Sequence, residues 1–445
     1  MVTTRFFSNP GPDGLPKTAD AVIIGGGPAG TAAAWALERA QPGLRIVLVE
    51  QGGQLGMGSS LASLENFRTC WAAPCLARMM QRSLTVFQNA DEELHPGATA
   101  TLSRKQQGYL FLAFNERGAA GLQQDVNHLH ACGLTHTEFL PASEVHTRYP
   151  WLGERVTAAK SDPHAGWLDS NALIYAFAHS TQTTRYLLDM RDVSIRVQGG
   201  KVAGVATASG MIAAPLVLIA AGAGSRAVGR TAGIELPIVV QPRQSFTTPW
   251  RHDAFPEDSP CVISAAPFPH VRPEARDGAI FGWEYRWNSR PALPGEPVQE
   301  YLIEPRWPVE HFKDPRFPSL TLALLARQFG HRAGEGFADP RYLRGIAHRA
   351  GYYVSRDHTV AYRTDSNGKR HPYHSQRAIL DGWPGIDGLY LSVAHVGHGV
   401  MSAPAAGEII AARMLGNPLP DPVYADFSLS AAYVERDAGG LSLPL

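Results

Sequence analysis

A glycine-rich turn between a short apolar run and a helix-forming segment is the feature that most constrains this chain. The β-branched run at 21–24 predicts a buried parallel strand, and Gly25-x-Gly27-x-x-Gly30 follows it directly. Residues 31–40 are rich in helix formers, and the apolar run at 45–49 predicts a second buried strand. Strand, turn, helix and strand in this order are typical of a Rossmann unit, which binds a dinucleotide.

A physical requirement explains the glycine at each of these three positions of the turn. Gly25 permits a tight turn, Gly27 lets a pyrophosphate approach the backbone, and Gly30 lets the helix pack on the strand. The N-terminus of the helix offers free N–H groups and the positive end of a dipole to the phosphates. Glu50 ends the second strand, where a carboxylate can accept hydrogen bonds from ribose hydroxyls. The turn alone does not separate FAD from NAD.

Length and composition limit the remaining choices. A chain of 445 residues predicts two or three domains, and its 44% hydrophobic and 18% charged residues are typical of a globular protein. The formal net charge of zero argues against nucleic acid or an anionic membrane as a partner. The sequence contains no HExxH or GxSxG pattern and no apolar run of membrane-spanning length. We therefore expect no metal, no membrane partner and, with four scattered cysteines and no apolar leader, a cytoplasmic location.

Two further motifs identify the cofactor by resemblance. The apolar run at 216–219 leads into Ala220-Ala221-Gly222, and the run at 389–393 leads into Gly397-His398-Gly399. With the glycine turn, these motifs resemble the D-amino acid oxidase superfamily of FAD-dependent oxidoreductases, and most of all its branch of sarcosine oxidase, glycine oxidase and dimethylglycine dehydrogenase. The resemblance runs from about residue 19 to about 420. It implies that the dinucleotide is FAD.

The resemblance also implies which residues contact FAD. In the family, the strand ending in Ala-Ala-Gly passes close to the cofactor, and the Gly-His-Gly turn lies under the N1/C2 edge of the flavin. Reduced flavin is negative at that edge, and the start of a helix predicted at 403–413 would stabilise it. His398 acts there through its backbone, or else it is a structural turn residue. The expected FAD contacts are Gly25, Gly27, Pro28, Ala29, Gly30, Glu50, Gln51, Gly58, Ser59, Ser60, Val193, Ala221, Gly222, Gly397, His398, Gly399, Val400 and Met401.

The fold implied by the family interleaves two domains along the chain. We expect an α/β, Rossmann-like FAD-binding domain from residues 1–100, 161–236 and 356–445. An α+β substrate domain built on a mixed or antiparallel sheet is expected from residues 101–160 and 237–355.

The segment at 58–68 resembles the loop that crosses FAD toward the flavin ring. Arg68 matches an arginine that commonly helps to hold the substrate carboxylate. Glu65 stands where the sarcosine oxidase group has a second arginine, so the charge is reversed. A carboxylate beside the flavin would repel a substrate carboxylate and would suit a cationic amine or a proton-transfer role. Alternatively, Glu65 forms a structural ion pair with Arg68.

Other positions also depart from the family pattern. Met401 replaces a lysine that grips the substrate carboxylate, and Ile280 replaces a lysine implicated in the reaction with oxygen. Glu284 stands where the group has an active-site histidine, and Tyr353 matches an active-site tyrosine or is a core residue. The catalytic candidates are therefore Glu65, Arg68, Glu284 and Tyr353.

The covalent link to FAD found in some relatives is not expected here. Gly351 falls where some members carry a cysteine bonded to FAD, and Ala62 falls where others carry a bonded histidine. Neither residue can form that bond, so we predict non-covalent FAD.

The expected reaction is oxidation of a C–N bond, in an amine or amide-like substrate, to an imine by hydride transfer to flavin N5. Loss of the lysine at Met401 favours a substrate larger than a simple amino acid, in keeping with a specialised pathway. The indoles of Trp250, Trp283, Trp287 and Trp307 either line a roomy apolar pocket or belong to the core. One alternative is an amino-acid or N-methylamino-acid oxidase or dehydrogenase, and another is a low-turnover flavoprotein that acts in assembly. The electron acceptor is oxygen or an electron carrier, and the protein is a monomer or a homodimer.

Overall fold

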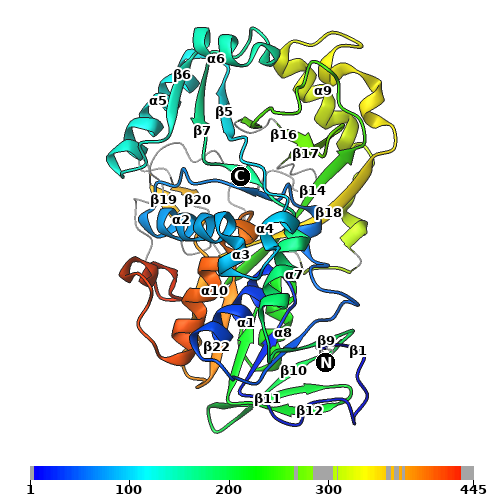
Figure 1. Ribbon diagram of the computed structural model, residues 1–445, viewed down its shortest axis with the longest axis vertical. Helices are drawn as coiled ribbons and strands as arrows, with labels where there is room; N and C mark the ends of the chain where they lie inside the picture. Colours follow the sequence, from blue (N-terminus) through cyan, green and yellow to red (C-terminus); the bar gives the residue numbers. More distant parts are fainter. Residues whose placement is uncertain are drawn as a thin grey trace.

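Two sheets stacked along the long axis of the molecule form the framework (Figure 1). The computed structural model describes residues 5–264, 269–283, 304–307, 309–356, 362–364, 370–372 and 376–431. In Figure 1 the lower half holds a seven-stranded sheet with its helices, and the upper half holds an eight-stranded sheet.

The lower sheet has the strand order β1-β9-β3-β2-β13-β22-β21. All neighbours are parallel except β21 and β22, which are antiparallel. A central parallel sheet of short apolar strands is the arrangement expected of a Rossmann-like domain. The strands are β1 Phe6–Ser8, β2 Ala21–Ile24, β3 Ile46–Val49, β9 Arg185–Leu188, β13 Leu216–Ile219, β21 Ile379–Gly382 and β22 Leu389–Val393.

Alternate residues of these strands enter two different cores, as the two-residue period of a strand requires. Ala21 and Ile23 pack with one group of helices, whereas Val22 and Ile24 pack on the opposite face. The helices of the first face are α1 Pro28–Ala40, α2 Pro74–Gln88, α7 Ser170–Ser180 and α10 Gly399–Leu415. The opposite face meets the antiparallel meander of β10 Ser194–Gln198, β11 Lys201–Thr207 and β12 Gly210–Ala213, with α8 Ser225–Thr231 nearby.

The upper sheet has the strand order β18-β14-β17-β16-β15-β5-β7-β6 and is mixed. Its only parallel pair among the described strands is β15 with β5. The strands are β5 Tyr109–Ala113, β6 Glu138–Pro141, β7 Ala158–Asp162, β14 Ile238–Thr248, β15 Cys261–Ser264, β16 His270–Glu274, β17 Gly278–Trp283 and β18 Ala347–Arg356. The helices α5 Glu116–Ala131, α6 Ala142–Arg148 and α9 Phe317–Phe329 flank it.

The strands β14 and β18 connect the two halves. Ile238 and Val240 of β14, with Tyr352 and Val354 of β18, pack into the core of the lower sheet. The remaining described elements are short: α3 Ala90–Glu93, α4 Ala98–Thr101, β4 Asn66–Phe67, β8 Gly166–Trp167, β19 Tyr362–Thr364, β20 Arg370–Pro372 and the 3-10 turns η1 Ser59–Ala62, η2 Pro150–Leu152, η3 Gly222–Gly224, η4 Val309–Phe312, η5 Gly336–Ala338, η6 Pro340–Leu343 and η7 Pro422–Phe427.

The predicted class, a Rossmann-like domain interleaved with a domain on a mixed sheet, is confirmed. The boundaries between the five segments stay a prediction. One predicted helix, at 403–413, begins earlier than expected, at Gly399. Pro404 lies inside α10. The true start puts the helix N-terminus directly after His398.

Candidate active site

The glycine turn has the three properties that its spacing predicts. Gly25 has a φ of +116°, and a Cβ on it would lie 2.4 Å from the carbonyl oxygen of Ala220. A Cβ on Gly30 would lie 1.9 Å from the carbonyl oxygen of Gly25, so only glycine lets the helix approach the strand. A Cβ on Gly27 would meet nothing within 4 Å, which leaves open space at the N-terminus of α1. This open cradle fits a pyrophosphate.

Glu50 lies beside this cradle. Its carboxylate accepts hydrogen bonds of 2.7 Å from the backbone N–H groups of Gly26 and Gly52. Burial raises the pKa of Glu50 although both bonds favour the ionised form. The carboxylate is therefore held at the strand end where a ribose would be recognised.

The three predicted motifs meet at one edge of the lower sheet. The glycine turn follows β2, Ala221 and Gly222 follow β13, and the Gly-His-Gly turn follows β22. These strands are adjacent and parallel, so their carboxyl ends face the same way. Ligands of open parallel sheets bind at that edge.

The remaining expected FAD contacts lie at several places in the structure. Gly58 directly precedes η1, Ser59 and Ser60 begin it, and a Cβ on Gly58 would meet nothing within 4 Å. Gln51 follows Glu50 and is exposed, and Val193 directly precedes β10 and packs, partly buried, against the core on that side of the sheet. Val400 and Met401 are buried in the helical core around α1 and α10, so their side chains pack there.

The segment that leads from β22 into the Gly-His-Gly turn is strained, and the turn is tightly packed. Ala394 and Val396 have φ values of +63° and +53°, which are costly for residues other than glycine and occur mostly at functional sites. His398 is 1% exposed, its ring packs edge-on against Trp71 at 5.1 Å, and burial lowers its pKa to about 3. A Cβ on Gly397 would lie 2.6 Å from the ring of Tyr353, so this tyrosine reaches the turn.

A cavity of about 30 Å³ lies next to Tyr353. It is lined by residues of η1 and the segment after it and by residues of β14, β16, β17 and β18. Its polar groups include Arg243, His270 and Tyr353, and the guanidinium of Arg243 lies 4.8 Å from the ring centre of Tyr353. The full lining is Ser59, Ala62, Ser63, Leu64, Arg243, Gln244, His270, Gly282, Trp283, Gly351, Tyr352 and Tyr353.

Gly351 and Ala62, the two positions considered for a covalent link, are neighbours in this cavity. A Cβ on Gly351 would lie 3.0 Å from the Cβ of Ala62 and 3.2 Å from the Cα of Ser59. The absence of reactive side chains at both positions supports the prediction of non-covalent FAD, which stays a prediction.

Arg68 is a buried cation. Its side chain is stacked on Trp71, with 4.1 Å from the guanidinium carbon to the ring centre, and lies 5.4 Å from Phe111. Arg68 is 9% exposed, its Nε has no hydrogen-bond partner, and it makes no ion pair with any residue that the structure describes. A buried charge without a counter-ion is costly, so an anion bound beside Arg68 would be stabilising.

The ion pair between Glu65 and Arg68, considered as an alternative to a functional role for Glu65, does not form. The carboxylate of Glu65 lies 3.6 Å from the guanidinium of Arg272 and accepts hydrogen bonds from the hydroxyl (2.6 Å) and N–H (3.2 Å) of Ser170. Burial raises the pKa of Glu65, against the effects of Ser170 and Arg272. The backbone of Glu65 has a φ of +60°, which turns its side chain toward α7. Glu65 does not line the cavity.

Arg272 was missed by the sequence reasoning. It is 1% exposed and lies on β16 below the loop at 63–66. Its Nε donates to the carbonyl oxygen of Leu64 at 2.8 Å and to Oδ1 of Asn66 at 3.1 Å, and it also pairs with Glu274. Arg272 therefore holds the backbone of Leu64 and the side chain of Asn66, the two neighbours of Glu65.

Asp162 was missed as well. This fully buried carboxylate on β7 accepts hydrogen bonds from the backbone N–H groups of Thr69 and Cys70 at 2.8 and 3.0 Å. Burial alone would raise the pKa of Asp162, but His136 and these N–H groups outweigh it and lower the pKa to about 2. Asp162 thereby holds the segment that directly follows Arg68.

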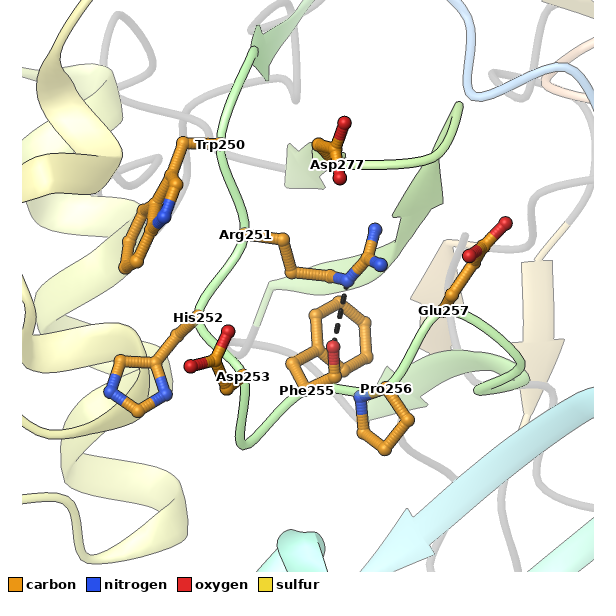
Figure 2. A pocket seen from close by; sticks show the side chains of 8 residues that line it. All are labelled: Trp250, Arg251, His252, Asp253, Phe255, Pro256, Glu257 and Asp277. Carbon is orange, nitrogen blue, oxygen red and sulfur yellow. Dashed lines mark hydrogen bonds between the residues drawn. The ribbon is translucent and has the colours of Figure 1, made fainter.

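A second, larger cavity of about 380 Å³ lies elsewhere, beyond the end of β14 (Figure 2). Figure 2 shows Arg251 in its wall, donating to the carbonyl oxygen of Phe255 at 2.7 Å. The other two nitrogens of Arg251 donate to the carbonyl oxygens of Gly278 and Arg276. The guanidinium of Arg251 is thus engaged by backbone carbonyl oxygens. None of the three FAD motifs lines this larger cavity.

The tryptophans considered for one roomy pocket are separated. Trp250 lines the larger cavity, Trp283 lines the small one, and Trp307 is 46% exposed. Trp287 and the catalytic candidate Glu284 lie outside the described residues. No group of three potential metal ligands occurs among the described residues, and no described helix is long and apolar enough to cross a membrane.

Comparison with known proteins identifies the family. The model of the family described as FAD dependent oxidoreductase (DAO) matches residues 20–413. The chain belongs to this family. It is therefore an FAD-dependent oxidoreductase. The open cradle at Gly27 and the N-terminus of α10, directly after His398, fit that cofactor.

Relatives and solved structures agree with this assignment. The chain is 25% identical to FAD-dependent oxidoreductase domain-containing protein 1 of Xenopus laevis, over 89% of this chain and 79% of that protein. It is 27% identical to the sarcosine oxidase subunit beta of an Arthrobacter species, over 54% of this chain and 60% of that protein. The structure of L-proline dehydrogenase from P. horikoshii superimposes with a TM-score of 0.69 at 21% identity, covering 91% of this chain and 96% of that one. The last similarity shows the fold alone.

Proposed function

We propose that this protein oxidises the C–N bond of an amine that carries a carboxylate, an amino acid or N-methylamino acid, to the imine. The observation that carries the proposal is the guanidinium of Arg68, buried and without an acidic partner among the described residues. A substrate carboxylate would supply the missing counter-ion. This choice favours the amino-acid alternative over an amine or amide-like substrate larger than a simple amino acid.

The protein's own share of the reaction is positioning and the exclusion of water. FAD supplies the acceptor for the two electrons and the hydrogen of the substrate C–H bond. Arg68 would hold the carboxylate, and the cavity beside Tyr353 would hold the amine end. Holding both ends fixes the C–H bond in one orientation, which is where much of the acceleration of such reactions arises.

Residues around Arg68 act as positioning residues. Asp162 holds the N–H groups of Thr69 and Cys70, and Trp71 covers one face of the guanidinium. Glu65 and Arg272 fix the loop before it. We therefore assign Glu65 a positioning role and not that of a general base, since its carboxylate is engaged by Ser170 and Arg272.

The test is reduction of the bound flavin in the absence of oxygen. The holoenzyme would be mixed with glycine, sarcosine, L-proline and L-phenylalanine, and with the carboxamide of each. We expect at least one of the acids to bleach the flavin, and we expect its carboxamide to require a higher concentration for the same bleaching. Arg68→Gln should raise the half-saturating concentration of the acid about 10- to 100-fold, the effect of one hydrogen bond to a charged group, and leave the amide unchanged.

Arg45→Gln serves as the matched control, because Arg45 is an exposed arginine paired with Asp20. Arg45→Gln should change the half-saturating concentration of neither the acid nor the amide. If no member of the panel bleached the flavin, the proposed amine oxidation would be refuted. If Arg68→Gln affected the acid and the amide equally, the proposed binding of the substrate carboxylate by Arg68 would be refuted.

A further inference from the structure

His270 lies on β16 and faces the small cavity. Its partner in register across the sheet is Gly282 of β17. A Cβ on Gly282 would lie 2.4 Å from Nε2 of His270, closer than real atoms approach. The imidazole therefore occupies the space that glycine leaves empty, and this fit keeps it against the cavity.

Both ring nitrogens of His270 are available for hydrogen bonds to a ligand. Within the described part of the chain, no hydrogen bond engages either ring nitrogen of His270. Burial, together with the nearby guanidinium of Arg243, lowers the pKa of His270 to about 4. The ring is therefore neutral near pH 7, with one N–H and one nitrogen lone pair.

We propose that His270 accepts a hydrogen bond from the amine N–H of the substrate, so that the enzyme prefers primary and secondary amines to tertiary ones. This inference rests on the proposed oxidation of an amine. It makes His270 a catalytic residue, since its ring would touch the substrate.

The chemistry of C–N oxidation favours an acceptor at this position. The substrate C–H bond breaks and its hydrogen leaves with both electrons to FAD, while the nitrogen lone pair forms the second C–N bond of an iminium ion. The lone pair must stay free for that step. An acceptor that binds the N–H leaves the lone pair free and orients it, whereas a donor would occupy it. A neutral tertiary amine has no N–H to offer.

The two charged or polar neighbours of His270 agree with this role. The positive charge of Arg243 opposes protonation of the imidazole, so the acceptor nitrogen is preserved. Tyr353 lies under the guanidinium of Arg243 and packs against Gly397, which connects the cavity to the turn expected under the flavin. The nitrogen of a substrate bound between His270 and this turn would lie near the flavin edge.

The test compares an amine with its N-methylated form in the holoenzyme. Sarcosine and N,N-dimethylglycine share a carboxylate and differ by one methyl group on nitrogen, and the same pairing applies to any other acid that bleaches the flavin. In the native protein, the rate of flavin reduction without oxygen should be higher with sarcosine. His270→Leu should lower that rate about tenfold, as expected for one hydrogen bond, and should not lower the rate with N,N-dimethylglycine.

Three further variants separate hydrogen bonding from packing. His270→Asn should recover most of the rate with sarcosine, because its side-chain oxygen also accepts. Gly282→Ala should resemble His270→Leu, because the new methyl group displaces the imidazole without removing it. His252→Leu, in the larger cavity, is the matched control and should change neither rate.

The outcomes distinguish the two proposals. Equal losses on both substrates, or an Asn variant no better than the Leu variant, would overturn the role of His270 and leave amine oxidation standing. Bleaching of the native flavin by no amine would refute the proposed function, and the role of His270 would fall with it.

Discussion

Asp162 offers the sharpest test of how the structure holds the segment after Arg68. Its two carboxylate oxygens accept from the backbone N–H groups of Thr69, Cys70 and His164 and from the hydroxyl of Thr69. Asn at this position is nearly the same size but has one acceptor oxygen. Asp162→Asn therefore leaves at least one N–H without an acceptor and turns an amide donor toward it.

The cost can be worked out from two terms. The pKa of Asp162 falls from an ordinary 3.8 to about 2 on folding, which at 1.36 kcal/mol per unit is about 2 kcal/mol of stability at neutral pH. An unsatisfied buried N–H adds about 1–3 kcal/mol. With about 2.1 cal/mol/K of unfolding entropy per residue, 445 residues give about 1 °C per kcal/mol, so we expect a lower melting midpoint by about 3–5 °C.

The pH dependence tests the first term separately. Because the folded pKa is lowered, the ionised carboxylate stabilises the fold fully above pH 3.8, and this contribution is lost as pH falls toward about 2. The difference in midpoint between the native protein and Asp162→Asn should narrow over that window in a flavin-fluorescence melt. Asp20→Asn is the control, since Asp20 is paired at the surface and should shift the midpoint by less than ~1 °C. The reasoning would be refuted if Asp162→Asn lowered the melting midpoint no more than Asp20→Asn. It would also be refuted if the difference in midpoint between Asp162→Asn and the native protein did not change with pH.

Four further expectations concern the cofactor site. Glu50→Ala should weaken FAD binding about tenfold, measured by release of flavin fluorescence on dilution, since it removes the carboxylate beside the cradle. Acid precipitation should leave the flavin in the supernatant, because Gly351 and Ala62 cannot bond to it. His395→Phe should shift the flavin reduction potential by roughly 30 mV, because His395 joins the hydroxyls of Ser392 (3.1 Å) and Ser402 (3.5 Å) across the strained turn. We expect substrate-reduced enzyme to recolour slowly in air and quickly with an artificial electron carrier, because Ile280 offers no cation at the position predicted to match an oxygen-reactive lysine.

The parts of the site that the sequence predicted are local. The glycine turn, Glu50 and the two later motifs each follow a strand within a few residues, so their geometry depends on the short segment around them. Placing the three motifs at one sheet edge needed only the rule that parallel strands share a direction.

The parts that were missed depend on contacts between distant segments. Asp162 reaches a residue 93 positions away, and Arg272 reaches one 208 positions away. One signal was present in the sequence. His270, Arg272 and Glu274 alternate along one strand, and such a period places three polar side chains on one face. That face lies against the loop at 63–66, but nothing in the sequence states which strand covers which loop.

Position 65 shows how a local comparison can invert the chemistry of a site. Seen alone, a carboxylate in place of an arginine indicates a pocket that repels anions. In the structure, Arg272 and Ser170 engage that carboxylate, so its charge is compensated before a substrate arrives. Arg68 is left as a buried cation without an acidic partner among the described residues, and the cost of that state is removed only when an anion binds. We therefore expect the selectivity of the site to follow from the charge that is left over after internal pairing, which here is the positive charge of Arg68.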